Sequence, residues 1–267
     1  MSVTNDDPHG NGMSPSPSPS STEALRTENE HLKKSVAFLT RELATLRGEM
    51  DIVQHRYAEA IQRLAATVEH KDCNAAKHIA RVSRYCEMIG RKIGMHGEEL
   101  DELVTAAPMH DIGKAAVPEA ILFKKGKLNT SEFLTVQMHT VTGAKMLAGS
   151  EVPVLKRARQ IALCHHEYWN GKGYPTGTRG SYTPLAGRIV HICDVFDALT
   201  SELAHKDAYP VEFAFDIIEN RKETEFDPEL VEALQDGLDT AIRIKAEIDS
   251  PENFPTYDFT LSGRDTA

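Results

Sequence analysis

A seven-residue repeat of apolar side chains over residues 22–69 constrains the fold of this chain more than any other feature. With Leu25 at heptad position d, the d positions are Leu25, Leu32, Leu39, Leu46, Val53 and Ala60, and the a positions are Asn29, Val36, Leu43, Met50, Tyr57 and Leu64. An apolar stripe that repeats every 3.5 residues predicts a coiled-coil helix. Asn29 at an a position favours two strands, because its amide needs a partner in the seam. We expect a dimerisation helix; the alternative is a long amphipathic helix that folds back on its own domain.

Composition divides the rest of the chain. Residues 1–21 alternate serine and proline and offer little to bury, so we expect a disordered tail. Beyond residue 70, apolar residues recur at helical spacing and alternating β-branched runs are missing. Glycine and proline concentrate in residues 170–184, which we expect to form the longest loop. The sequence therefore predicts an all-α domain over residues 70–246 and a C-terminal tail over 247–267.

Charge and cysteine content exclude several classes of protein. The formal net charge of -10 argues against a general affinity for nucleic acid or anionic membrane, so any phosphate chemistry must be local. The four cysteines have no Cys-x-x-Cys spacing, which argues against a disulfide framework and a thiolate zinc site. We expect Cys164 and Cys193 to be buried as small apolar residues. With no signal sequence and no bilayer-length apolar run, we expect a cytoplasmic protein.

Histidines and carboxylates recur where helices could bring them together. The candidate metal ligands are His78, His110, Asp111, His139, His165, His166 and Asp194. His165 and His166 end an apolar helix, where two buried imidazoles without partners would be costly. Asp194 lies in the apolar segment RIVHICDVFDAL, and a buried carboxylate needs a cation or several donors. In HDIGK, His110 precedes a carboxylate that can bridge two cations, and Lys114 follows one turn later. One metal site would satisfy all three segments.

The order of these segments resembles the HD-GYP family of HD-type metal-dependent phosphohydrolases. From about residue 72 to residue 236 the chain carries, in family order, H..RV at 78–82, HDIGK at 110–114, H...G from His139, HHE.W.G.GYP at 165–175, DVFDALT at 194–200 and FDP at 226–228. The resemblance covers most of the chain beyond the coiled coil. It implies the family's all-α helical bundle, here preceded by a long coiled-coil helix.

The family's ligand roles imply a centre of two metals. The first metal would be held by His78, His110, Asp111 and Asp194, and Asp111 would bridge to a second metal held by His139, His165 and His166. Some family members bind a third metal through a glutamate four residues before the first histidine. Asn74 occupies that position here, so we expect two. Because the donors are nitrogen and carboxylate oxygen, we expect divalent transition metals, with iron or manganese ahead of zinc and others.

The family's reaction implies phosphodiester hydrolysis by a metal-activated bridging hydroxide. The implied substrate is cyclic di-GMP, opened to pGpG and in some members hydrolysed onward to GMP. Asp111 and Lys114 are the expected catalytic residues, because Lys114 would neutralise a phosphate oxygen or aid proton transfer. Tyr174 would contact the nucleotide; the alternative is packing within its own loop.

One segment departs from the family pattern. After DALTS the family usually continues with Arg-Pro-Tyr and a basic residue, whereas this chain has Leu203 at the arginine position and keeps Lys206 as the second basic residue. We expect Lys206 to contact the substrate. Loss of one charge-assisted contact would cost ~1.5–3 kcal/mol of binding. Weak affinity for cyclic di-GMP, or preference for another cyclic dinucleotide, is therefore expected.

Two rival functions stay open at this level. One is a catalytically weak receptor that binds cyclic di-GMP and signals through partner contacts, and the other is an HD phosphohydrolase that acts on another phosphoester. His191, three residues before Asp194, either donates a hydrogen bond to the site or points away. The expected partners are a cyclic dinucleotide, a second copy of the chain and proteins that bind the GYP loop, without nucleic acid or membrane.

Overall fold

The computed structural model describes residues 19–69, 73–202 and 208–250. Within these ranges the backbone forms helices joined by turns, without a strand, which confirms the predicted all-α class. The chain divides into two compact units, Met1–Arg56 and Tyr57–Ala267. Most of the two predicted tails lies outside the described residues.

The heptad repeat forms a single long helix, α1 (Pro19–Glu69). Proline at its first position is compatible with a helix start, because the N–H at that position would have no partner within the helix. In the first unit the side chains of the predicted seam are exposed, with Leu39 and Leu43 each 58% accessible to solvent. The predicted helix is thus present, whereas its pairing with a second copy stays a prediction.

The last turns of α1 belong to the second unit. Ile61 and Ala65 are buried in its apolar core, whereas Leu64, on the predicted seam, stays exposed. Positions four residues apart share one face of a helix, so this face packs on the core and leaves the seam in solvent. Residues 57–69, predicted as part of the coiled coil, therefore also contribute to the globular unit.

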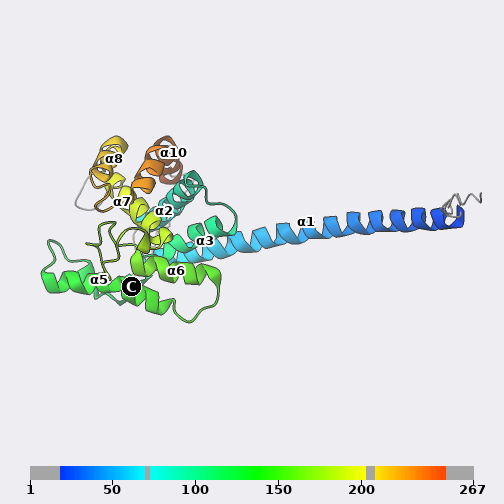
Figure 1. Cartoon of the computed structure of the whole chain (residues 1–267). Helices are drawn as coiled ribbons and strands as arrows, with labels where there is room; N and C mark the ends of the chain where they lie inside the picture. Colours follow the sequence, from blue (N-terminus) through cyan, green and yellow to red (C-terminus); the bar gives the residue numbers. More distant parts are fainter. Residues whose placement is uncertain (1–18, 70–72, 203–207, 251–267) are drawn as a thin grey trace, which may run out of the picture. The chain divides into compact units, whose positions relative to one another are not determined.

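The second unit continues with shorter helices (Figure 1). They are α2 (Cys73–Lys92), α3 (Glu98–Ala106), α4 (Glu119–Leu122), α5 (Thr130–Met146), α6 (Pro153–Cys164), α7 (Leu185–Thr200), α8 (Val211–Glu219), α9 (Pro228–Gln235) and α10 (Leu238–Asp249), with the 3₁₀ turns η1 (Ala107–Met109), η2 (Ile112–Ala116) and η3 (Gly180–Tyr182). Among the described residues, no helix has the length and apolar character needed to cross a membrane.

Helix α7 lies at the centre of this unit, in contact with α2, α6, α8 and α9. Its apolar residues, among them Ile189 and Phe196, are buried, and the ring of Phe196 meets the ring of Tyr85 on α2 edge to face at 5.3 Å. A helix with apolar residues around most of its surface is typical of a core position. This packing fixes Asp194 of α7 beside α2, which carries His78.

Helix α5 packs against η2 and α6 and so brings three ligand segments together. A capping box fixes its start: the Asn129 side chain accepts a hydrogen bond from the Glu132 N–H, and the Glu132 carboxylate accepts one from the Asn129 N–H. Gly113 lies so close to α5 that a Cβ atom there would overlap the carbonyl group of His139. Glycine at position 113 therefore permits the approach that sets Asp111 beside His139.

Candidate metal centre

The structure brings all seven predicted ligands into two adjoining groups. The first group consists of His78, His110 and Asp194, and the second group consists of Asp111, His139, His165 and His166. Within each group the potential ligand atoms lie within 4.8 Å of one another. The groups meet where His110 Nε2 lies 3.3 Å from Asp111 Oδ2. This division is the one that the family resemblance implied, with Asp111 between the two sites.

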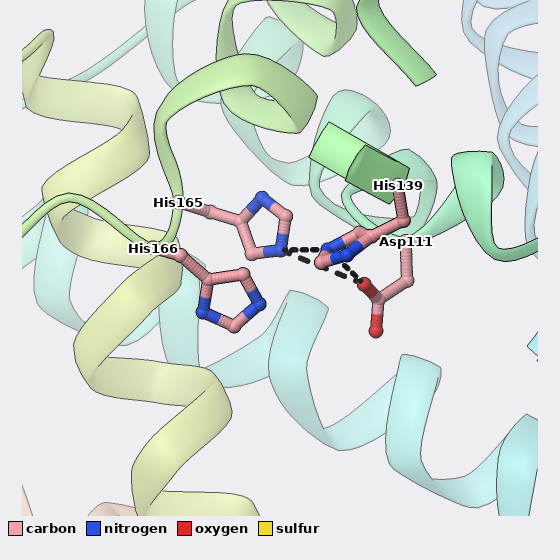
Figure 2. Close-up of side chains that lie close together, drawn as sticks. All are labelled: Asp111, His139, His165 and His166. Carbon is pink, nitrogen blue, oxygen red and sulfur yellow. Dashed lines mark hydrogen bonds and ion pairs between the residues drawn. The ribbon is translucent and has the colours of Figure 1, made fainter. Parts of the chain in front are cut away.

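The second group converges on Asp111, as Figure 2 shows. Oδ1 of Asp111 lies 3.1 Å from Nε2 of His139 and 3.5 Å from Nε2 of His165, and these two nitrogens are 3.4 Å apart. The ring of His166 lies beside that of His165, with centroids 4.1 Å apart. Adjacent imidazoles at the end of α6 thus both face the carboxylate, because the backbone leaves the helix at His165.

Backbone carbonyl groups orient three of these imidazoles. Each Nδ1 lies next to a carbonyl oxygen, which can only accept a hydrogen bond, so these contacts require a proton on Nδ1. The distances are 2.9 Å from His110 to Ala107, 2.6 Å from His139 to Val136 and 3.1 Å from His165 to Ile161. In a neutral imidazole this tautomer leaves the lone pair on Nε2, which points into the centre.

Burial and charge adjust the protonation of the second group toward metal binding. Burial acts to raise the pKa of Asp111, but Lys114 and His110 outweigh it and hold this pKa well below its ordinary value. Burial lowers the pKa of His165 and, more strongly, that of His166, so both imidazoles are neutral at physiological pH. An ionised carboxylate and neutral imidazoles are the forms that coordinate metals.

A carboxylate holds the first group in place. Nδ1 of His78 lies 2.8 Å from Asp197 Oδ2, while its Nε2 lies 3.6 Å from Asp194 Oδ1. Asp197 in turn accepts hydrogen bonds from the buried guanidinium of Arg81, at 2.5 Å from Nε and 2.9 Å from Nη2. A carboxylate that binds the second nitrogen of a ligating histidine fixes its ring and raises its basicity.

Sequence analysis assigned no role to Asp197 or Arg81. A signal was present, because Asp197 follows Asp194 by three residues and Arg81 follows His78 by three, so each pair shares one helix face. A charged residue at these positions is also compatible with an exposed face. Only the packing of α2 on α7 shows that Arg81 and Asp197 are buried together.

Of the predicted catalytic and substrate-binding residues, Lys114 and Tyr174 lie at the second ligand group, whereas Lys206 lies outside the described residues. Lys114 forms an ion pair with Asp111, so its ammonium lies at the second group. Tyr174 stacks on His166, with ring centroids 4.7 Å apart and an interplanar angle of 28°. The expectations for Lys206 and Leu203 concern positions outside the described residues. Asn74 lies in α2, but its side chain is outside the described part of the chain.

Glu167, the third residue of HHE, organises the loop that carries Tyr174. Its buried carboxylate accepts hydrogen bonds from the backbone N–H groups of Thr176 at 2.7 Å, Gly177 at 3.2 Å and Thr178 at 3.0 Å. Across the loop, the N–H of Tyr174 donates to the carbonyl of His166 at 3.0 Å. The GYP segment is therefore tied to the end of α6, and sequence analysis had left Glu167 without a role.

His191 and the cysteines lie in the core near the site. Nε2 of the buried His191 lies 3.5 Å from Glu225 Oε1, and its ring stacks on Phe226 with centroids 5.2 Å apart. Within the described residues its ring also lies beside those of His166, with centroids 6.3 Å apart, and Tyr168, with centroids 5.5 Å apart. Cys164 and Cys193 are buried as expected, and the thiol of Cys164 donates to the carbonyl of Gln160.

The residues of the second group fit a cation. With Nδ1 as donor, Nε2 of His139 and Nε2 of His165 are acceptors in their neutral forms, and the ionised Asp111 only accepts. Acceptors held 3.1 to 3.5 Å apart in a buried site repel one another unless positive charge lies among them. Nitrogen and carboxylate donors without thiolate suit divalent first-row metals. The His/Asp cluster could thus hold the metals on which HD domains depend.

Comparisons with known proteins identify the family to which this chain belongs. An HD domain family model matches residues 49–230. The 3′3′-cGAMP-specific phosphodiesterase 2 of Vibrio cholerae is 37% identical over 190 residues, which cover 71% of this chain and 36% of that protein. The cyclic di-GMP phosphodiesterase response regulator RpfG of Xanthomonas campestris pv. campestris is 35% identical over 213 residues, which cover 80% of this chain and 56% of that protein.

The fold is also found among solved structures. A cyclic GMP-AMP specific phosphodiesterase of V. cholerae aligns with a TM-score of 0.50 and 20% identity, over 74% of this chain and 55% of that one. At this identity the likeness bears on the fold alone. The chain spans 36% and 56% of the two curated relatives. The family model covers more than half of the chain and includes every candidate ligand. The chain belongs to the HD domain family, and its ordered motifs place it in the HD-GYP group of that family.

Proposed function

We propose that this protein is a metal-dependent phosphodiesterase that hydrolyses a cyclic dinucleotide, with cyclic di-GMP as substrate and pGpG or GMP as product. The observation that carries the proposal is the pair of adjoining ligand groups with Asp111 at their junction. The relatives named above are phosphodiesterases of cyclic di-GMP and of 3′3′-cGAMP, and this supports the substrate class.

The geometry supports a role for each of these residues in the proposed reaction. Two divalent cations bound there would supply Lewis-acid activation of water and neutralise charge on phosphate oxygens. Asp111, kept ionised by Lys114 and His110, would be shared by both sites. Lys114 projects from the turn after Asp111, where its ammonium could bind a phosphate oxygen or transfer a proton. The burial of His110, His139 and His165 keeps bulk water away from the ligands.

We also propose that α1 pairs two copies of the chain. The apolar seam side chains of α1 within the first unit, from Leu25 to Val53, are exposed, and exposed apolar stripes of this length are rare in monomers. Asn29 in the seam favours two strands. Pairing would place two phosphodiesterase domains in one molecule.

Turnover tests the proposed function. Protein purified without oxygen or chelator and loaded with iron or manganese should open cyclic di-GMP or 3′3′-cGAMP, with products separated by chromatography. His139→Ala should reduce kcat at least a hundredfold, because it removes a ligand. His96→Ala, at an exposed position outside the site, is the matched control and should match the parent.

Leu203 favours the receptor as a second candidate, because the family's arginine is missing there. A metal-loaded protein that binds a cyclic dinucleotide without converting it would support the receptor and overturn the phosphodiesterase. A protein that hydrolyses only other phosphoesters would overturn the substrate class.

A further inference from the structure

A pocket lies beside the metal centre, between α5 and the GYP loop. Its volume is ≈ 400 Å³, within the range of small-ligand pockets. Four residues of α5 and two of the loop line it: Leu134, Thr135, Gln137, Met138, Tyr174 and Pro175. None of these six carries a charge, so the pocket is not built for a phosphate group.

The pocket shares a wall with the metal centre. Tyr174 lines the pocket and also stacks on His166, and its ring centroid lies 6.4 Å from that of His139. Met138 lines the pocket immediately before His139 in α5. A phosphodiester held by the second ligand group would therefore place the next chemical group of the same molecule at this pocket.

The lining favours a flat aromatic ring with a polar edge. Leu134 and Met138 present apolar surface, with 57% and 50% of each residue exposed, and Tyr174 adds an aromatic ring. Gln137 is half-buried, and its side-chain amide forms no hydrogen bond with the described residues. Apolar walls with a few polar groups that fix orientation are typical of nucleobase and cofactor sites.

We infer that this pocket binds one purine base of the cyclic dinucleotide whose phosphodiester lies at the metal centre, and that the Gln137 amide reads the edge of that base. This inference rests on the proposed function and deepens it, because it assigns base selection to α5. An amide offers one donor and one acceptor side by side, which matches an edge that carries one of each. Guanine (N1–H and O6) and adenine (N6–H and N7) both have such an edge, so glutamine accepts either base.

The substitution Gln137→Glu should make the pocket bind guanine more tightly than adenine. A carboxylate only accepts hydrogen bonds, so it pairs with the N1–H and N2–H donors of guanine. The same carboxylate would face an acceptor nitrogen on either edge of adenine. The ratio of KM for cyclic di-AMP to KM for cyclic di-GMP should therefore rise about tenfold or more. If the protein does not hydrolyse one of these dinucleotides, the constant for its inhibition of hydrolysis of the other takes the place of KM in this ratio. A general folding defect would change both values together and leave the ratio unaltered.

Two methionines on α5 provide a matched pair for the apolar wall. Met138 is 50% exposed and lines the pocket, whereas Met146 is 51% exposed and lies two turns further along the same helix. Met138→Ala should raise KM for cyclic di-GMP about fivefold, because it removes surface under the base. Met146→Ala should leave KM and kcat at parent values.

The outcomes separate the inference from the proposed function. The base-binding role of the pocket is supported if the parent hydrolyses the dinucleotide, Gln137→Glu raises the ratio of the two KM values, and Met138→Ala raises KM for cyclic di-GMP. If the parent hydrolyses the dinucleotide and both variants keep the parent's KM values, the base-binding role of the pocket is overturned and the proposed phosphodiesterase activity stands. A parent that cleaves bis(p-nitrophenyl) phosphate and none of the cyclic dinucleotides overturns both proposals, since its metal centre then works without the expected substrate.

Discussion

At the scale of single residues, Asp197 connects the stability of the fold with the metal centre. Burial acts to raise its pKa, but hydrogen bonds from His78 and Arg81 outweigh this and hold the pKa of Asp197 below its ordinary value. A depressed pKa adds stability above the carboxyl pKa of the unfolded chain, and this stability is lost as the pH falls through the folded-state value. The same carboxylate orients His78, so acid should loosen the packing of α2 on α7 and the first ligand group together.

Substitution of Arg81 should be costly for stability. Arg81→Met leaves Asp197 buried without its guanidinium partner, and loss of one member of a buried ion pair costs about 3–5 kcal/mol. Denaturant unfolding monitored by circular dichroism measures the change. Arg84 lies on the same helix as Arg81 and forms an exposed ion pair with Glu247 of α10. Arg84→Met removes this pair and is the control, which should cost about 0–1 kcal/mol. Equal losses of unfolding free energy in the two variants would show that the buried ion pair stabilises the fold no more than the exposed one.

The candidate ligands could be predicted from sequence, whereas the residues that support them could not. His110, Asp111, His165 and His166 stand in short motifs whose order carries the information. Arg81 and Asp197 are 116 residues apart, and their pairing depends on a helix contact that no local pattern encodes. The role of a charged residue on a helix is set by what packs against it, and this is a tertiary property.

At the scale of elements, the contact between η2 and α5 sets the distance from Asp111 to His139. It requires glycine at position 113, because a side chain there would overlap the backbone of His139 and of Gly143. HDIGK was predicted as a ligand motif from its histidine and aspartate. The reason for its glycine could be found only from the packing of the two elements.

Gly113→Ala should therefore separate the ligands of the second group. We expect a folded, helical protein that has lost metal affinity by at least tenfold, because backbone atoms cannot move aside as a flexible side chain can. Metal content after dialysis against a weak chelator, with circular dichroism on the same samples, measures this. Gly48→Ala on α1 is the control, since a Cβ at that position meets no atom within 4 Å. Full metal retention in Gly113→Ala would contradict the account of this contact.

The seam of α1 leads to a prediction about assembly. Leu39→Glu should convert the dimer to a monomer, because it places a charge in the middle of the paired helices. Light scattering should give twice the chain mass of 29.6 kDa for the parent and the mass of one chain for the variant. Phe38→Glu is the matched control: Phe38 is adjacent and similarly exposed, at 63% against 58%, but lies off the seam. A monomeric parent would refute the coiled coil.

At the scale of the whole molecule, the helical class and the site could be predicted because heptads and ordered motifs are patterns along the chain. The pocket beside the metal centre could not, because α5 and the GYP loop contribute its walls from separate segments. Gln137 and Met138 belong to no recognisable motif, and only their position beside Tyr174 in the folded chain marks them as part of a pocket.

Metal stoichiometry tests the central claim, which is a two-metal centre joined by Asp111. Elemental analysis of protein purified without oxygen or chelator should give two equivalents of transition metal per chain. Asp111→Ala should lose most of this metal, because its carboxylate lies at the junction of both ligand groups. A reproducible single equivalent in the parent, or full metal retention in Asp111→Ala, would contradict the account.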